Sequence, residues 1–456
     1  MNIAHHRTKW LLFISLGMGF SGSACLNLGT SPNNPTGSSG MGGSGASAEG
    51  GGGMGMSAGG NGGHANDPCA GLPTQNVIYV HGLDGDDAAG TGACEKPFKT
   101  IKKAHSVAAS LGTATTIHLA GALPPIVYSA QTNGEDAEIQ LMAPGLTLEG
   151  EGMDKTIISG GGLCAPISTM SNCAVLLTAP LSLIRNVHLT STLGVTLRST
   201  APLLRLENVI ISDGVNNSGL FAQGDVDAYL TNVRVENNGS PGILFSNTGT
   251  QSLTMNNCTI TSNAGDGLRM EGSGTVISNN NAFLGNKGAG ILVQNDVALT
   301  STGDTFELNA NGLILGSIGI TNEIVIDGAK IQKNLNHGIQ ILNVKSFKLR
   351  NSVVLGNAKY GLDTALDDTI VDLGRMGDLG GNTFQSSNIN TKNVGAGVCY
   401  SGMGTLSAYG NNWSSCPPKG TTNMPCGGGT DFGTTLGSFN ASGPCTPMLR
   451  SPGSPL

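Results

Sequence analysis

The sequence predicts an all-β solenoid, a fold in which short strands stack coil upon coil. A phrase recurs along the chain, made of an apolar run that ends in Asn, a short loop, and a Gly followed by a second apolar run. The Asn of this phrase recurs at intervals of 23, 23, 25 and 23 residues, at Asn263, Asn286, Asn309, Asn334 and Asn357. A period of this length is typical of repeat proteins, whose units bury their apolar faces only against their neighbours.

Composition favours the same fold class. The 456 residues include 71 Gly, and only 4% are aromatic and 12% charged. This mixture suits short strands joined by turns and does not suit helix bundles, which are rich in Glu, Lys, Leu and Ala. The net charge of -7 argues against a nucleic-acid-binding protein, because no excess of basic side chains is available to neutralise phosphates.

The first 25 residues predict an export signal. A basic head that ends at Lys9 is followed by an apolar core over residues 10–20 and by small residues at 22–24. The apolar core has 11 residues, which is too short to span a bilayer as a helix.

Cys25 follows the small residues, and the segment resembles a bacterial lipoprotein signal. The resemblance implies that Cys25 is lipidated and that the protein is held at the outer membrane or cell surface. Gly22 departs from the pattern, since such signals usually carry Leu there, and the alternative is ordinary secretory cleavage near Ala24. Residues 26–66 are mostly Gly, Ser, Asn, Met and Ala, and they predict a flexible tether with a reach of roughly 35 Å.

The folded domain is expected over residues 67–416, with a tail rich in Gly, Thr and Pro at 417–456. A strand is predicted over 75–80. An amphipathic helix is predicted over 97–111, because Pro97 suits a first turn, apolar residues recur on one face, and Gly112 can end it. This helix would cover the open end of the solenoid, where strand edges would otherwise stay unpaired.

Motifs at both ends of the domain carry a family resemblance. Tyr79, residues 90–92 and residues 96–101 resemble the start of bacterial right-handed parallel β-helix proteins of the pectate-lyase-like superfamily, in particular an uncharacterised branch of surface lipoproteins. Residues 380–384 and 410–413 resemble the closing stretch of these proteins. The resemblance spans about residues 75–415 and implies a right-handed single-stranded parallel β-helix. It does not select a function, because the superfamily holds lyases, hydrolases, epimerases and non-enzymatic surface proteins.

Within the domain, strands are predicted over 116–119, 146–150 and 183–189, followed by Asn-apolar phrases at Asn208, Asn232 and Asn257. Coils of two or three strands would stack about 4.8 Å apart. The row that begins at Asn263 predicts a structural asparagine ladder, since stacked amides can bond to one another and satisfy polar groups of the turns. A carbohydrate-binding row is the alternative.

The chain contains ten cysteines. Cys258 takes the place held by Val209 and Val233 in earlier coils, which predicts a buried thiol. Sequence proximity suggests four disulfides, which the exported state makes plausible: Cys69–Cys94, Cys164–Cys173, Cys399–Cys416 and Cys426–Cys445. No pair has the spacing of a zinc or redox motif.

One acidic loop predicts a cation site. Asp84, Asp86 and Asp87, with Gly85 between, could place oxygen ligands around calcium. The loop lacks the glutamate that completes an EF-hand, and the alternative is a polar turn before the helix. No other cofactor is predicted.

The outward positions that follow each coil Gly were considered for catalysis. Carboxylates do not stack on consecutive coils there, which argues against a catalytic groove on that face. The positions are Arg269, Glu271, Leu292, Gln294, Ile314, Gln340, Leu342 and Asp363. Further acids, Asp225, Asp227, Asp367 and Asp368, are interpreted as solvated turns. His337 is a general-base candidate, although a single His at a turn is more often structural.

The favoured hypothesis is a non-catalytic surface module that binds polysaccharide or another envelope component and contacts the membrane only through its lipid. The alternatives are a polysaccharide lyase or glycoside hydrolase, and a structural spacer or adhesin. The aromatic candidates for stacking on sugars do not align by coil, and they are Tyr229, Tyr360, Tyr400, Tyr409 and Trp413. No oligomeric state is predicted.

Overall fold

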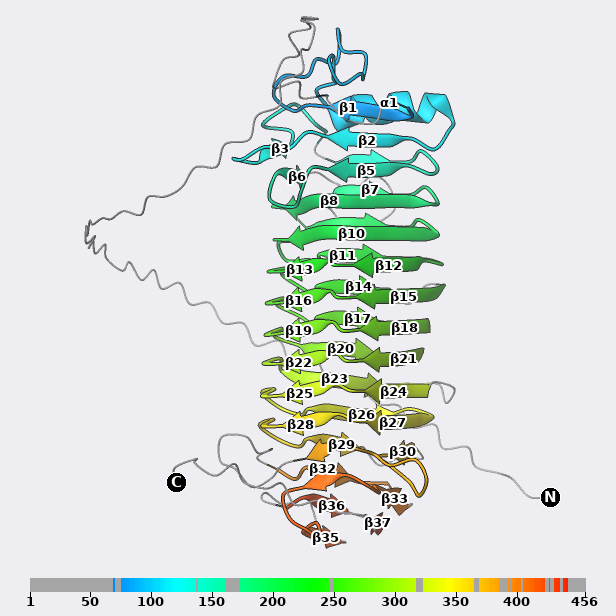
Figure 1. The fold of residues 1–456 in the computed structure, drawn as a ribbon, viewed down its shortest axis with the longest axis vertical. Coiled ribbons are helices and arrows are strands. Elements are labelled where there is room, and N and C mark those ends of the chain that lie inside the picture. The colour runs from blue at the N-terminus through cyan, green and yellow to red at the C-terminus, as the bar shows by residue number, and fades with distance from the viewer. Residues whose placement is uncertain are drawn as a thin grey trace, which may run out of the picture. The chain divides into compact units, whose positions relative to one another are not determined.

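The computed structural model describes residues 69, 75–136, 138–160, 173–192, 194–246, 249–316, 323–364, 369–384, 393, 395–402, 405–422, 426, 430–434 and 438–441. They belong to one compact unit that begins at Ala65. The strands stack one above another from α1 towards the C-terminal coils (Figure 1). The predicted solenoid is confirmed as a parallel β-helix, because the strands pair in parallel from coil to coil.

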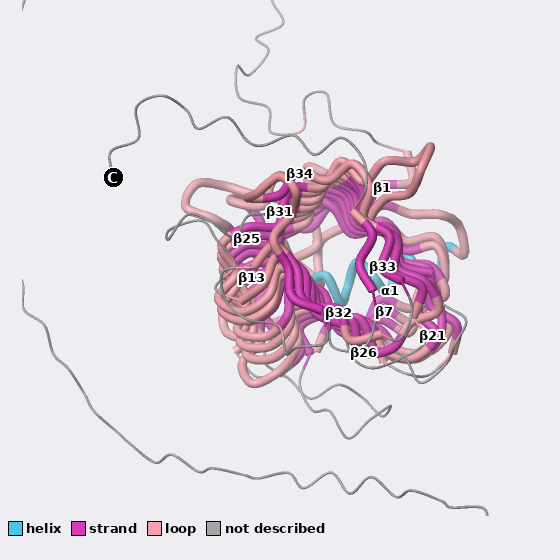
Figure 2. Tube along the Cα trace, turned by 90° about the horizontal axis from the view of Figure 1, so that it is seen from below, coloured by secondary structure: helices cyan, strands magenta, loops and turns pink. Residues whose placement is uncertain are grey.

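Viewed along the stack, the strands form three columns around the core (Figure 2). The first column, called face A, contains β1 (Val77–Val80), β2 (Thr116–Leu119), β5 (Thr147–Gly150), β8 (Ser182–Ser191), β10 (Leu203–Ser212), β12 (Asp227–Thr231), β15 (Thr250–Asn256), β18 (Ser273–Asn279), β21 (Asp296–Thr302), β24 (Glu323–Asp327), β27 (Ser346–Arg350), β30 (Ile370–Asp372), β33 (Thr405–Ser407) and β37 (Ser438–Asn440).

The second column, face B, begins with β3 (Ile126–Tyr128) and β6 (Thr156–Gly160) and includes the later halves of β8 and β10. It continues through β13 (Arg234–Glu236), β16 (Thr259–Thr261), β19 (Ala282–Leu284), β22 (Thr305–Glu307), β25 (Lys330–Gln332), β28 (Val353–Leu355), β31 (Thr383–Phe384) and β34 (Asn412–Trp413).

The third column, face C, is a separate sheet. It contains β4 (Ile139–Leu141), β7 (Cys173–Leu177), β9 (Val195–Ser199), β11 (Leu220–Ala222), β14 (Ile243–Phe245), β17 (Leu268–Met270), β20 (Ala289–Val293), β23 (Asn311–Gly316), β26 (Ile339–Asn343), β29 (Leu362–Thr364), β32 (Val398–Tyr400), β36 (Phe432–Thr434) and β35 (Gly420–Thr422). Strands β35 to β37 lie beyond residue 416, so the β-helix continues into the segment predicted as a tail.

Side chains from strands of all three faces fill one continuous apolar core. In β15, for example, burial alternates along the strand, as expected when one face of a sheet packs inward. Aromatic rings stack between coils: Phe283 lies over Phe306 at 5.1 Å, and Phe384 lies over Trp413 at 5.0 Å. Cys258 is buried in this core as a free thiol, as predicted, and burial raises the pKa of the Cys258 thiol to about 11.

Helix α1 (Ile101–Leu111) starts four residues later than predicted. Phe98 is bridged to Val80 and keeps the preceding residues extended, and the Thr100 side chain accepts a hydrogen bond from the Lys103 amide as the N-cap. The Glu135 carboxylate accepts bonds from the Ile101 and Lys102 amides, which satisfies further free donors of the first turn. The predicted end is confirmed, because Gly112 adopts φ 62°.

The predicted asparagine row is a buried asparagine ladder. In Asn263, both the backbone amide and Nδ2 donate to Oδ1 of Asn286, at 3.1 and 2.9 Å, and Nδ2 also donates to the Val235 carbonyl. The same pattern repeats in the following coils, and the ladder also includes Asn238 and Asn393 at its two ends. The ladder residues are at most 1% exposed, so the alternative of a carbohydrate-binding row is wrong.

A second column of residues turns the chain from face A to face B. Asn186, Asn208, Asn232 and Asn257 adopt φ between 53° and 57°, the left-handed region in which Asn is tolerated well. Gly303 takes the same place in a later coil, where a Cβ would meet the Asn280 side chain at 2.4 Å. The Asn-apolar phrases of the sequence are therefore corners, with each Asn fixing the bend.

Disulfides join residues near both ends of the β-helix. Cys69–Cys94 is confirmed, whereas Cys399 bonds to Cys426, so the predicted pairings of Cys399 with Cys416 and of Cys426 with Cys445 are wrong. Their sequence separations are 25 and 27 residues, shorter than the coils of 39 and 34 residues that the strand register gives at these two places. Cys416 is also disulfide-bonded. The predicted Cys164–Cys173 pairing and Cys25 lie outside the described residues.

Candidate functional site

A row of polar side chains runs up the outer side of face A at its N-terminal end. The strand register places Tyr79 beside His118, His118 beside Glu149, and Glu149 beside Arg185 on four successive coils. Each of these residues alternates with a core residue of its strand, such as Ile78 or Ile117, and therefore faces outward. Coil stacking spaces the four side chains about 4.8 Å apart.

His118 lies between two carboxylates. Its Nδ1 is 3.9 Å from Glu149 Oε2, and its Nε2 is 3.5 Å from Glu151 Oε1. Arg185 Nε lies 3.0 Å from the other oxygen of Glu149, which holds that carboxylate in place. The His118 Nε2 atom is buried and makes no hydrogen bond to any residue that the structure describes. The ring therefore lies between two carboxylates, with Nε2 enclosed by the protein.

A hollow of about 720 Å³ opens over Tyr79 and His118. The Tyr79 and His118 rings lie 5.3 Å apart at its floor. The Cys69–Cys94 disulfide forms part of its wall, and residues of the loop between β1 and α1 form another part. The disulfide therefore ties the rim of this hollow, called the His118 hollow below, to the first coil.

The His118 hollow is electronegative. Among its described lining residues, Asp84, Glu95 and Glu151 carry carboxylates, and none is Lys or Arg. Burial, and then the negative charges of Glu149 and Glu95, raise the pKa of the Tyr79 hydroxyl, so Tyr79 stays protonated at neutral pH. Together these groups supply hydrogen-bond acceptors, one aromatic ring and an imidazole at the lining of the hollow.

In the acidic loop that was predicted to bind calcium, the three carboxylates have different surroundings. Asp86 accepts hydrogen bonds from the Ala88 and Ala89 amides, which lower the pKa of the Asp86 carboxyl. Asp87 accepts bonds from the Lys99 and Thr100 amides just before α1. Asp84 lines the His118 hollow. Within the described part of the chain no group of three or more His, Cys, Asp or Glu is arranged to hold a metal ion, and calcium binding stays a prediction.

The outward positions that follow each coil Gly lie on face C, and carboxylates do not stack there on consecutive coils, as predicted. On face C the register aligns Arg269, Leu292, Ile314, Gln340 and Asp363 on consecutive coils, and apolar residues separate the charged ones. The row on face A was not predicted from the sequence. Its members are 39, 31 and 36 residues apart, because long loops separate the first coils. Each member of the row nevertheless occupies an outward position in a strand that the sequence predicted.

The aromatic candidates are mostly not available to a sugar. Tyr400 and Trp413 are buried in the core, and the Tyr360 hydroxyl donates to the Cys426 carbonyl. Tyr409 accepts a bond from the Asn440 side chain. Tyr229 is 44% exposed, with the Arg205 guanidinium over its ring. The aromatic residue at the candidate site is Tyr79, which was not among the predicted candidates for stacking on sugars.

His337 is a buried structural group rather than a base at a site. Its Nδ1 is 3.6 Å from Asp363 Oδ2 and its ring packs 5.5 Å from Tyr360. Burial first, and then the Lys359 charge, lower the pKa of His337 to about 4, and burial raises the pKa of Asp363. The imidazole is therefore neutral at neutral pH, and its contact with Asp363 is not an ion pair.

We expect stability to depend on pH through His337. Because its folded pKa is lowered, the neutral ring contributes fully above the unfolded value of about 6.5, and this contribution is lost as the pH falls from there to about 4. The loss should be about 1–2 kcal/mol after allowing for solvent screening. Denaturation midpoints between pH 7.5 and pH 4 measure it. His337→Gln should be less sensitive over this window, and an identical pH profile for both proteins would contradict the assignment.

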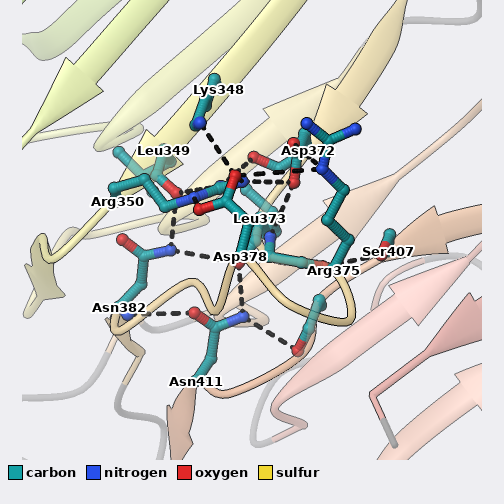
Figure 3. Close-up of polar contacts among 12 residues, drawn as sticks. Lys348, Leu349, Arg350, Asp372, Leu373, Arg375, Asp378, Asn382, Ser407 and Asn411 are labelled. Carbon is teal, nitrogen blue, oxygen red and sulfur yellow. Dashed lines mark hydrogen bonds and ion pairs between the residues drawn. The ribbon is translucent and has the colours of Figure 1, made fainter.

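A third polar cluster anchors the stretch at 373–381 between β30 and β31 (Figure 3). Arg350 is 5% exposed, and its Nη2 lies 2.8 Å from Asp372 Oδ1 and 2.9 Å from Asp378 Oδ2. Its Nη1 donates to the Leu349 and Asp372 carbonyls. Arg350, and then Lys348, lower the pKa of Asp378 well below its usual range. These contacts hold the stretch at 373–381 against β27 and β30.

A model of a protein family, described as "Right handed beta helix region", matches residues 173–321. The fold is a right-handed parallel β-helix. No curated protein matches the sequence. The described part of the chain contains no helix that is long and apolar enough to cross a membrane.

Solved structures of the same architecture resemble the chain at low identity. The A-module of the mannuronan C-5 epimerase AlgE4 from Azotobacter vinelandii is 17% identical, with a TM-score of 0.42, over 82% of this chain and 98% of that one. Tailspike protein 2 of an Escherichia coli O157:H7 bacteriophage is 12% identical, with a TM-score of 0.49, over 74% and 44%. Pectate lyase Pel9A is 11% identical, with a TM-score of 0.41, over 84% and 83%.

Proposed function

We propose that the protein binds a glycan in the His118 hollow. The observation that carries the proposal is the pairing of Tyr79 and His118 on successive coils at the floor of a hollow of about 720 Å³ that Glu151 also lines. Sugar rings present hydroxyl groups at their edges and C–H groups on their faces. Carboxylates and an imidazole can bond to the hydroxyls, and an aromatic ring can pack on the C–H face. Concave sites of this volume are typical of small-ligand binding.

The charge of the hollow indicates which glycans bind. Asp84, Glu95 and Glu151 line it without a Lys or Arg among the described lining residues, so a polymer of uronic acids would be repelled. Neutral sugars can use the same carboxylates as hydrogen-bond acceptors, and protonated amino sugars are attracted by them. The proposed ligands are therefore neutral or amino-sugar glycans.

The sequence supports an exported, lipid-anchored protein at the outer membrane or cell surface, with lipid on Cys25 and a tether at 26–66. In this arrangement the β-helix would be presented to glycans of the envelope or its surroundings. Mass spectrometry of the mature N-terminus tests the anchor: a lipid-modified Cys25 is expected, and an unmodified N-terminus would contradict it.

A second candidate function, glycoside hydrolysis, is favoured by one specific observation. The Glu149 and Glu151 carboxylates approach opposite nitrogens of His118, and hydrolysis of glycosidic bonds usually requires two carboxyl groups that flank the substrate. Binding and hydrolysis make different predictions for the products, since only hydrolysis releases new reducing ends.

A glycan panel tests the proposal with the full mature chain in mild detergent. Chitin, chitosan, cellulose, alginate and polygalacturonate are offered as immobilised polymers, and protein retention and new reducing ends are followed together. Retention on neutral or amino-sugar polymers without new reducing ends is the expected result, and new reducing ends would assign the second candidate. Retention only on alginate or polygalacturonate, or on none of the five, would overturn the proposal.

Matched variants locate the binding. His118→Ala should weaken retention at least about tenfold, because it removes a hydrogen-bonding group and part of the floor of the hollow. Glu207→Gln is the control, since Glu207 continues the same row one coil beyond Arg185 and does not line the hollow. Equal losses in both variants would mean that the glycan binds elsewhere.

A further inference from the structure

A second hollow, of about 620 Å³, lies next to the first along the chain. The two hollows are lined by successive residues of one turn: Glu151 lines the His118 hollow, and Gly152, Met153 and Asp154 line the second. The second hollow reaches from this turn across the corner between faces A and B. Nothing in the proposed function uses it.

The floor of the second hollow is a row on the outer side of face B. The register aligns Ile157, His188, Ile210 and Arg234 on four successive coils, and all four line the hollow. The floor is thus an imidazole between two aliphatic side chains, with a guanidinium at one end. Such a surface can pack against an apolar ring face and still offer polar groups at its edge.

The His188 ring is held in one tautomer. Ser212 Oγ donates to Asp213 Oδ2 at 2.6 Å, because a carboxylate can only accept. The single hydroxyl proton is thereby used, so the 2.8 Å contact between Ser212 Oγ and His188 Nε2 is a bond that the imidazole donates. Burial lowers the pKa of His188, so the ring is neutral at neutral pH. Its Nδ1 is then a hydrogen-bond acceptor.

Two groups at the edge of the hollow are also held in place. The Asn208 side chain donates to Asn186 Oδ1 at 3.1 Å, which orients the corner amides. Arg234 Nε lies 3.0 Å from Glu236 Oε2, so the guanidinium is fixed at the far end of the floor. The hollow therefore combines an acceptor on His188, amide groups on one side, and a cation.

We propose that the second hollow is a further sugar subsite, filled by the same glycan chain that enters the His118 hollow. This inference rests on the proposed function. The aliphatic floor of Ile157 and Ile210 suits the C–H face of a sugar ring, and His188 Nδ1 suits one of its hydroxyls.

The distance between the two hollows determines how long a glycan must be to fill both. His118 is two coil steps from Arg185, which lies on the same strand as His188, so the two histidines are separated by roughly 10 Å along the solenoid. A disaccharide that fills the first hollow leaves the second hollow empty. Affinity should therefore rise once the oligosaccharide extends past the turn at 151–154.

The proposed second subsite is tested by varying the length of the oligosaccharide. Chito-oligosaccharides and cello-oligosaccharides of one to six units are titrated calorimetrically into the full mature chain in mild detergent. At least a tenfold gain in affinity between two and six units is expected, together with its loss in His188→Ala at unchanged disaccharide affinity. Arg234→Gln, at the edge of the hollow, should reduce the gain as well, and it provides a second variant if His188→Ala does not fold.

The outcomes separate the two proposals. If disaccharide and hexasaccharide bind equally to the wild-type chain, or if the gain with length persists in both variants, the second subsite is wrong and the proposed function stands. If no oligosaccharide binds, the proposed function fails and the subsite fails with it. His118→Ala should weaken all lengths, which distinguishes the first hollow from the second.

Discussion

Asn286→Ala is expected to lower the free energy of unfolding by about 3–5 kcal/mol, the largest effect of any single substitution considered for this protein. Asn286 Oδ1 accepts two bonds from Asn263, and its Nδ2 donates to the Ile260 carbonyl and to Asn309. Alanine would leave two donors of Asn263 and the Ile260 carbonyl unsatisfied in the core. Each such buried group costs about 1–3 kcal/mol, and partial entry of water keeps the sum below the maximum.

The measurement is a denaturant titration combined with amide hydrogen exchange in the coils that contain Asn263 and Asn286, because long repeat arrays can lose all-or-none cooperativity. Asn232→Gly is the matched control: Asn232 lies at an exposed corner with φ 55°, a conformation that Gly adopts without strain. The control should change stability by less than about 1 kcal/mol. Equal stability of the two variants would show that the buried asparagine ladder is dispensable.

Arg350→Ala should lower the free energy of unfolding by about 2–3 kcal/mol at neutral pH. Arg350 contacts the Asp372 and Asp378 carboxylates and two backbone carbonyls, and removing one partner of a buried ionic group is usually more costly than removing an exposed one. The expected loss in free energy of unfolding is smaller than for a fully buried ion pair, because solvent screens the exposed side of the cluster. The segment at 373–381 should also exchange its amide hydrogens faster.

Arg375→Ala is the control for this prediction. Arg375 belongs to the same cluster, but its side chain is 67% exposed and its Nε is 3.8 and 3.9 Å from the two carboxylates, so the expected change is within about 0.5 kcal/mol. The lowered pKa of Asp378 sets the pH dependence: its contribution is present above the unfolded value of about 3.9 and is lost as the pH falls below it. A difference between wild type and Arg350→Ala that persists unchanged at pH 2 would contradict this account.

Much of the fold could be predicted because the relevant signals are local and periodic. The row that begins at Asn263 follows from its spacing, and the end of α1 follows from Gly112, since both depend on backbone geometry that few residues adopt. The burial of Cys258 follows from its place in the repeat. The start of α1 was predicted too early, because bridging of Phe98 to Val80 is a tertiary effect.

The candidate site was not predicted, because it depends on register between coils of unequal length. Tyr79 and His118 are 39 residues apart in sequence but adjacent across one pairing of strands. The same reason explains the error at Cys399, where proximity in sequence favoured Cys416 but the stacking of coils brings Cys426 close. In a solenoid, contacts follow the coil and not the shortest stretch of chain.

The central claim is that a glycan binds over face A at the N-terminal coils, and amide hydrogen exchange of the full mature chain with and without chitohexaose tests it most directly. We expect slower exchange in β1, β2 and β5 and in the turn at 151–154, which surround His118. Face C, including β17, β20, β23 and β26, should be unchanged. Protection confined to face C, or no protection at a saturating concentration of the sugar, would contradict the account.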